Sequence, residues 1–152
     1  MIRVMFVCHG NICRSPMAEF IFRDIIIKEG KDGIISVFSS ATSTEEIGNP
    51  VYPPARRELL RHGISADGKR AVRLEKSDYD KYDLFIGMDS ANIRNMHRIF
   101  GADPDCKIVK LLELAGEMRD VADPWYTGDF ETTYNDCLRG CEALLKHLED
   151  NA

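Results

Sequence analysis

The residues best suited to chemistry lie near the start of the chain, where Cys8 and Arg14 enclose five residues. Gly10 and Asn11 adopt positive φ angles most readily, so this segment can curl its backbone amides around an anion. Arg14 can hold two phosphate oxygens at once, and its positive field favours a thiolate at Cys8. The hydroxyl of Ser15 can donate a hydrogen bond to that sulfur. We therefore expect Cys8 to be a nucleophile in a phosphate-binding loop made of His9, Gly10, Asn11, Ile12, Cys13 and Arg14.

A carboxylate far along the chain can complete this chemistry. Asp123 precedes Pro124, which stiffens the backbone, and Trp125 and Tyr126 follow directly. Cleaving a phosphate ester of tyrosine requires a proton for the phenolate oxygen, which a carboxylic acid supplies. Trp125 and Tyr126 can form an aromatic wall against the substrate ring. Asp-Pro is also a common turn pair, and an isolated tryptophan is usually a core residue, so partnership with Cys8 gives this motif its functional interpretation.

Hydrophobic periodicity indicates the elements that must position these residues. The apolar segment 2–7 predicts a buried strand that ends at the loop. A helix is predicted from about Arg14 to Gly30, with Phe20 and Ile25 on its inward face, and its N-terminal amides point at the expected anion. Further strands are predicted over 34–39, 84–88 and 107–111, and further helices over 55–62, 90–100 and 129–149.

Strands that alternate with helices predict an α/β fold: a parallel sheet with helices on both faces, joined by right-handed crossovers. Ligands of such sheets bind beyond the carboxyl ends of the strands, which is where the Cys8 loop is expected. The 152 residues fit a single domain over 1–152, and 44% hydrophobic with 30% charged residues is typical of a globular protein.

Charge and cysteine content limit the classes of function. A net charge of −5 argues against a nucleic-acid partner. The first apolar run is too short for a signal peptide or a membrane span, so we expect a cytoplasmic protein without a membrane partner. Five cysteines without framework spacing indicate free thiols in a reducing compartment. We expect a monomer or weak dimer.

The string from Val7 to Pro16 resembles the signature of the low-molecular-weight protein tyrosine phosphatase family, and Asp123 to Tyr126 resembles its Asp-Pro-aromatic-aromatic motif. The resemblance implies a three-layer, doubly wound, four-stranded parallel sheet of flavodoxin-like topology. It implies a phosphoric monoester hydrolase that acts through a phosphocysteine on Cys8, with Asp123 as general acid and then general base. Its substrate would be a phosphotyrosine protein or a small aryl phosphate, with no metal or organic cofactor.

The same resemblance assigns residues around the loop. Ser40 would support Asn11 and Ser15 through hydrogen bonds, and Asp89 would orient groups near the loop. Glu46 and Ile47 match a rim position that is aromatic in many tyrosine-specific members. Some members carry a histidine before the third strand, where this chain reads Gly68-Lys69-Arg70.

Related activities share this fold. Arginine-phosphate phosphatases tend to have threonine where Ile12 stands and a smaller residue where Tyr126 stands, so both residues favour phosphotyrosine. Arsenate reductases need two further cysteines near residues 80 to 90, and this segment contains none. A redox-sensing anion-binding module would use Cys8 and Cys13 without hydrolysis, although such a module needs no proton donor like Asp123.

The remaining cysteines have plainer interpretations. Cys13 is either a packing residue or a partner that captures oxidised Cys8 as a reversible disulfide. Cys137 and Cys141 lie four residues apart on a predicted helix, but no Cys or His cluster completes a zinc site with them. We expect Cys137 and Cys141 to pack in the core.

Overall fold

The computed structural model describes residues 1–151 and has a sheet of four parallel strands at its centre. Residue 152, the last of the expected domain, lies outside the described residues. The strands are β1 (Ile2–Cys8), β2 (Ile35–Ala41), β3 (Leu84–Gly87) and β4 (Ile108–Lys110). Their order is β2-β1-β3-β4, and every neighbouring pair is parallel. This confirms the predicted doubly wound, four-stranded sheet, in which the order of strands reverses beside β1.

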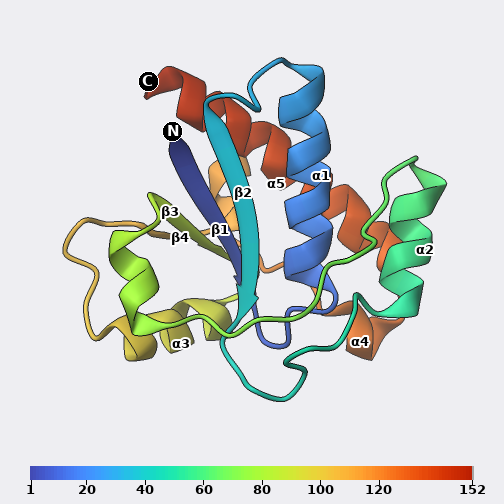
Figure 1. The fold of residues 1–152 in the computed structure, drawn as a ribbon, viewed down its shortest axis with the longest axis horizontal. Coiled ribbons are helices and arrows are strands. Elements are labelled where there is room, and N and C mark those ends of the chain that lie inside the picture. The colour runs from blue at the N-terminus through green and yellow to red at the C-terminus, as the bar shows by residue number, and fades with distance from the viewer. Residues whose placement is uncertain (152) are drawn as a thin grey trace.

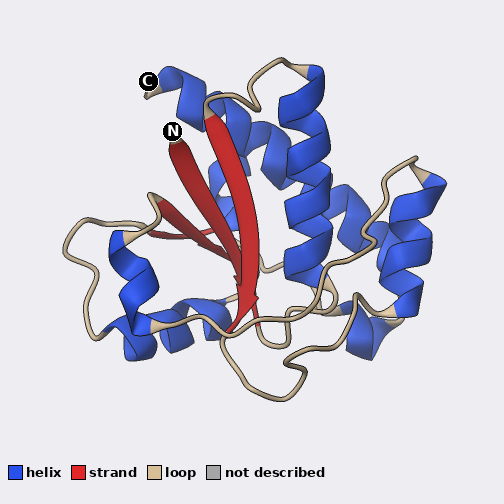
Figure 2. Cartoon of the chain, viewed as in Figure 1, coloured by secondary structure: helices blue, strands red, loops and turns tan. Residues whose placement is uncertain are grey.

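Helices cover both faces of the sheet, as Figures 1 and 2 show. One face packs against α1 and α5, and the other packs against α3. The helices are α1 (Arg14–Lys28), α2 (Pro53–Arg61), α3 (Ser90–Phe100), α4 (Pro124–Thr127) and α5 (Phe130–Asp150). Two 3₁₀ segments, η1 (Lys76–Asp80) and η2 (Leu111–Ala115), and the short α4 were not predicted, because single turns leave no periodic pattern.

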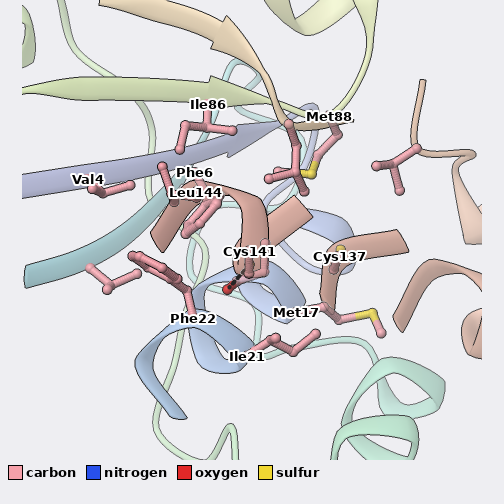
Figure 3. Packing of buried hydrophobic residues seen from close by; sticks show 14 of the residues in the cluster. Val4, Phe6, Met17, Ile21, Phe22, Ile86, Met88, Cys137, Cys141 and Leu144 are labelled. Atoms are coloured by element: carbon pink, nitrogen blue, oxygen red, sulfur yellow. Dashed lines mark hydrogen bonds between the residues drawn. The ribbon is translucent and has the colours of Figure 1, made fainter. Parts of the chain in front are cut away.

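Alternation along β1 divides its side chains between two buried clusters. Val4, Phe6 and Cys8 face the cluster shared with α1 and α5, whereas Met5 and Val7 face the cluster shared with α3. Figure 3 shows Phe6 close to Phe22 of α1 and Leu144 of α5. Period-two alternation therefore places the Cys8 side chain on the α1 side of the sheet.

Two predicted details are wrong at the level of single residues. In α1, Phe22 and Ile26 are fully buried, whereas Phe20 and Ile25 are only partly covered. The helix contacts both the sheet and α5, so its buried face is wider and rotated from the expected stripe. Strand β2 continues to Ala41 rather than ending at residue 39, because its pairing with β1 extends to Cys8.

The helix α5 buries the two cysteines that are four residues apart. Cys137 and Cys141 are both inaccessible to solvent, and their sulfurs lie 4.0 and 3.6 Å from the carbonyl oxygens of Arg14 and Ala18. Burial raises the pKa of Cys137 to about 12. Their environment is that of core thiols that hold α5 against α1.

No helix in residues 1–151 has the length and apolarity needed to cross a membrane.

Candidate active site

The carboxyl ends of β1 and β3 meet the N-terminus of α1 at one edge of the sheet. Cys8 is the last residue of β1 and Arg14 is the first of α1, so the five residues between them form the connecting loop. In Figure 1 this loop, the loop after β2 and α4 gather at the lower edge of the molecule. Strand order reverses at this position, as expected for a ligand site of an open α/β sheet.

The loop turns back on itself at Asn11. Asn11 has a φ of 61°, and its backbone N–H donates to Cys8 Sγ at 3.3 Å. The expectation that Gly10 shares this conformation is wrong, because Gly10 is not among the residues with positive φ. Space is limited at position 10 instead, since a Cβ there would lie 3.3 Å from Cγ of Glu46. One residue with positive φ is therefore enough to curl the loop toward the sulfur.

The thiol group of Cys8 is almost fully buried beneath the loop, at 4% exposure. Ser15 Oγ lies 2.9 Å from Cys8 Sγ, from the first turn of α1. The Asn11 side chain is fixed at both ends, because Nδ2 donates to Ser15 Oγ at 2.8 Å and Oδ1 accepts from the backbone of Val72 at 3.1 Å. The nucleophile candidate and its supporting hydroxyl are thus held by one amide side chain.

The serine of β2 that joins this network is Ser39, which corrects the expectation for Ser40. Asn11 Nδ2 also donates to Ser39 Oγ, at 2.9 Å, whereas Ser40 Oγ is buried without a hydrogen-bond partner in residues 1–151. Ser39 shares the strand face of Ile35 and Val37, which packs toward α1. Because successive side chains of a strand point to opposite faces, a shift by one residue exchanges the two hydroxyls.

The network continues inward to a buried ion pair that the sequence analysis did not identify. Ser39 Oγ donates to Glu19 Oε1, and Lys69 Nζ lies 3.7 Å from the same oxygen and donates to the Ser39 carbonyl at 3.0 Å. Burial lowers the pKa of Lys69, against the opposing charge of Glu19. Lys69 belongs to the segment where some family members have a histidine. The lysine in place of that histidine was the sequence feature that could have indicated a different partner for the network.

Arg14 is buried and aimed by acceptors from two other loops. Its Nη1 donates to Asp89 Oδ2 at 2.7 Å and to the Val121 carbonyl at 2.9 Å. Burial alone would lower the pKa of Arg14, but the charges of Cys8, Asp89 and Asp123 together raise it above its ordinary value. Asp89 is itself fixed as the N-cap of α3, where it accepts from the Asn92 N–H at 2.8 Å. The guanidinium is therefore charged and preoriented.

Asp123 faces the loop from the opposite side of the site. Its Oδ1 accepts from the Trp125 N–H at 3.0 Å as the N-cap of α4, and its Oδ2 lies 3.5 Å from Nη2 of Arg14. Trp125 and Tyr126 are exposed, at 53% and 85%. Tyr52, which the sequence analysis did not identify, supports this side because its ring centroid lies 4.8 Å from that of Trp125.

A pocket of about 250 Å³ joins these groups. Its walls include Ile12, Cys13, Arg14, Asp123, Trp125 and Tyr126. Glu46 lines the rim as expected, whereas Ile47 is exposed and not part of the lining. His9 is also part of the lining, and its Nε2 lies 2.9 Å from Glu45 Oε2. Burial, with the charge of Cys8, raises the pKa of Cys13 well above its ordinary value. Within residues 1–151 no three His, Cys, Asp or Glu side chains are grouped to hold a metal ion.

A family model described as low molecular weight phosphotyrosine protein phosphatase matches residues 3–152. The chain is 42% identical over 151 residues to the low molecular weight protein-tyrosine-phosphatase YfkJ of Bacillus subtilis, covering 98% of this chain and 97% of that protein. It is 38% identical to the low molecular weight phosphotyrosine protein phosphatase of Gallus gallus, over 94% of this chain and 93% of the relative. The crystal structure of YfkJ superposes with a TM-score of 0.96 at 41% identity, covering 99% of this chain and 96% of that one.

Proposed function

The chain belongs to the low molecular weight phosphotyrosine protein phosphatase family, and on that basis we propose that it hydrolyses phosphotyrosine and aryl phosphates through a phosphocysteine on Cys8. The observation that carries the proposal is a pocket lined by a buried guanidinium and a carboxylate, with the Cys8 sulfur directly beneath the loop that forms it. Arg14 and Asp123 line this pocket, and Cys8 lies at the base of the loop that forms it. These are the three groups that attack, charge stabilisation and leaving-group protonation require.

In the first step the Cys8 thiolate attacks phosphorus in line with the ester oxygen. A sulfur–phosphorus bond forms while the phosphorus–oxygen bond to the ring breaks. The amides of the loop from His9 to Arg14 and the Arg14 guanidinium stabilise the charge on the three equatorial oxygens. Asp89 serves this step indirectly, because its 2.7 Å hydrogen bond fixes the direction of the Arg14 side chain.

Asp123 supplies the proton that the departing phenolate requires. Its carboxyl group lies opposite the loop, on the side of the pocket where Trp125 and Tyr126 can flank a substrate ring. After the phenol leaves, the same carboxylate accepts a proton from water as the water attacks the phosphocysteine. The sulfur–phosphorus bond then breaks, and the thiolate that leaves is stabilised by the Ser15 hydroxyl, 2.9 Å from Cys8 Sγ.

The experiment that tests this function compares phosphotyrosine, phosphoarginine and arsenate as substrates of the purified chain. We expect turnover of phosphotyrosine to exceed turnover of the other two, since aromatic side chains flank the pocket. Rapid acid quenching during turnover of an aryl phosphate should leave phosphate attached to Cys8, detectable by mass spectrometry. Faster turnover of phosphoarginine, or arsenate reduction without ester hydrolysis, would contradict the proposed substrate class.

We further place the activity in the cytoplasm and in one domain over residues 1–152. All five cysteines, including Cys8 and Cys13, are free thiols, which suits a reducing compartment. A thiolate nucleophile keeps its activity only while it stays reduced. Activity that requires added reductant, and that is lost on mild oxidation and regained with thiols, would support this location.

A further inference from the structure

A second, smaller pocket lies beside the candidate active site. It has a volume of about 200 Å³ and is lined by side chains of the loop after β2, of the segment before η1 and of α3. His9 lines both this pocket and the larger one, so the two are neighbours across a single side chain. None of the steps proposed for phosphate transfer uses this pocket.

The floor of the small pocket is tied directly to the phosphate-binding loop. The Thr42 N–H donates to the Cys8 carbonyl at 3.0 Å, and the Ser43 N–H and hydroxyl both donate to the His9 carbonyl, at 3.1 and 2.9 Å. A group bound in this pocket would therefore have a fixed position relative to the nucleophile. Because His9 lines both pockets, a residue close in sequence to the phosphotyrosine can reach the smaller one.

Two guanidinium groups, from Arg73 and Arg98, line the pocket, and no acidic residue does. Neither arginine forms an ion pair with a carboxylate of residues 1–151. Arg98 Nη1 donates to Asn95 Oδ1, at 2.9 Å. Glu45 and Glu46 line the larger pocket, and Glu45 lies 2.9 Å from His9, which lines both pockets. The small pocket is thus lined by positively charged side chains, in a chain with a net charge of −5.

Polar groups without partners are concentrated at the same place. Within residues 1–151, the buried side-chain atoms that lack a hydrogen bond are Ser40 Oγ, Thr42 Oγ1 and Arg73 Nε. All three lie at the short bridge where Ala41 pairs with Arg73. Thr42 is more than nine-tenths buried and lines the pocket together with Arg73. Buried polar groups without partners are costly, and each one calls for an explanation.

We propose that this pocket binds an anionic side chain of the substrate, close in sequence to the phosphotyrosine. A carboxylate or a second phosphate between the two guanidinium groups would relieve their mutual repulsion and accept several hydrogen bonds. The proposal rests on the phosphotyrosine phosphatase activity proposed above and adds a preference among its peptide substrates. Acidic residues on the other flank of the phosphotyrosine would not reach the two guanidinium groups.

The test compares peptides that differ only at the residues next to phosphotyrosine, which are Glu, Gln or phosphoserine, placed on one flank at a time. Hydrogen bonds and ion pairs of this kind predict that kcat/KM for the Glu peptide exceeds that for the Gln peptide by about three- to tenfold, on one flank only. The phosphoserine peptide distinguishes a preference for phosphate from one for carboxylate. The Glu-to-Gln ratio should fall as salt is raised.

Variants of the two arginines assign the effect to the pocket. Arg98→Gln should bring the Glu-to-Gln ratio close to one, and Arg73→Lys should lower it partly, because lysine keeps the charge and loses the planar fork. Arg94→Gln is the matched control, since Arg94 is an exposed arginine of the same helix outside the pocket. The ratio is measured within each variant, so a general loss of folded or active protein cancels.

Several outcomes would overturn the inference. A wild-type ratio near one on both flanks would refute the pocket while leaving the phosphatase activity intact. An equal fall of the ratio in Arg94→Gln and Arg98→Gln would show a general effect of surface charge instead of a binding pocket. Failure of the wild-type chain to hydrolyse any phosphotyrosine peptide or p-nitrophenyl phosphate would refute the proposed function itself, and the pocket with it.

Discussion

The two sides of the candidate active site are built in different ways. The loop side places Cys8, Asn11 and Arg14 in the interior and holds their side chains through hydrogen bonds to Ser15 and Asp89. The α4 side presents Trp125 and Tyr126 to solvent on one turn of helix. Groups that stabilise charge gain most from a rigid, water-poor environment, whereas a surface that meets varied substrates does not require one. Each of the following experiments tests one side of this division.

The largest effect is expected on the buried side, from Cys8→Ser. A serine hydroxyl is a much weaker nucleophile than a thiolate, so we expect no measurable hydrolysis of an aryl phosphate. Phosphate binding should persist, because the loop amides and Arg14 remain, and isothermal calorimetry with inorganic phosphate would measure it. Turnover near that of the wild type would show that another residue attacks phosphorus.

Asp123→Asn tests the chemistry on the exposed side. General acid catalysis typically contributes about 10²–10⁴-fold, so kcat/KM for phenyl phosphate, which reports the step in which the ester bond breaks, should fall within that range. The loss should be much smaller for p-nitrophenyl phosphate, whose leaving group needs little protonation. Asparagine can keep the N-cap bond to the Trp125 N–H, so α4 should be retained. Equal losses with both esters would rule out the role as proton donor.

Two adjacent serines provide a matched pair for the buried network. Ser39→Ala removes a partner of Asn11 and Glu19, and loss of such buried hydrogen bonds should lower the free energy of unfolding by about 1–3 kcal/mol. Ser40→Ala removes a hydroxyl without a partner, so stability should be unchanged or slightly raised. Urea denaturation of both variants measures the difference. The reverse order would support Ser40 as the network residue.

Substitution in the aromatic wall should affect substrate binding more than stability, unlike substitution of Ser39. Tyr126 is 85% exposed, so Tyr126→Ala should change the free energy of unfolding by no more than about 0.5 kcal/mol. Loss of contact with the substrate ring should raise KM for phosphotyrosine by a few-fold, with a smaller change in kcat. If thermal unfolding showed a large loss of stability instead, Tyr126 would have to be assigned a structural role.

The smallest effect concerns the pH dependence of stability. Burial lowers the pKa of Lys69 from its ordinary value of 10.5, so below that pH the unfolded chain binds its proton more strongly than the folded chain. Lys69 therefore makes the free energy of unfolding rise with pH up to about 10.5, because the folded chain loses the proton of Lys69 before the unfolded chain does. Denaturation of Lys69→Gln between pH 7 and 10.5 should show a weaker rise than the wild type. An unchanged slope would mean that Lys69 titrates normally.

The sequence was sufficient for features that depend on neighbouring residues. The strand that ends at Cys8, the helix that begins at Arg14 and the helix over 90–100 all agree with the structure. The doubly wound, four-stranded parallel sheet that the family resemblance implies is also confirmed. Single-turn elements and the exact inward face of α1 were not predicted, because they depend on packing against partners distant in sequence.

What the sequence alone determined is the chemical identity of the site: a thiol, an arginine and amides on one short loop, with a carboxylate before proline. Tertiary structure decided which distant residues serve that loop. Strand register determines that Ser39, and not Ser40, bonds to Asn11. The loops after β3 and before α4 bring Asp89 and Asp123 to Arg14. Arg73 and Arg98 line one pocket only after the chain has folded. The loop needs only local backbone preferences, whereas these contacts need the sheet and its helices to pack first.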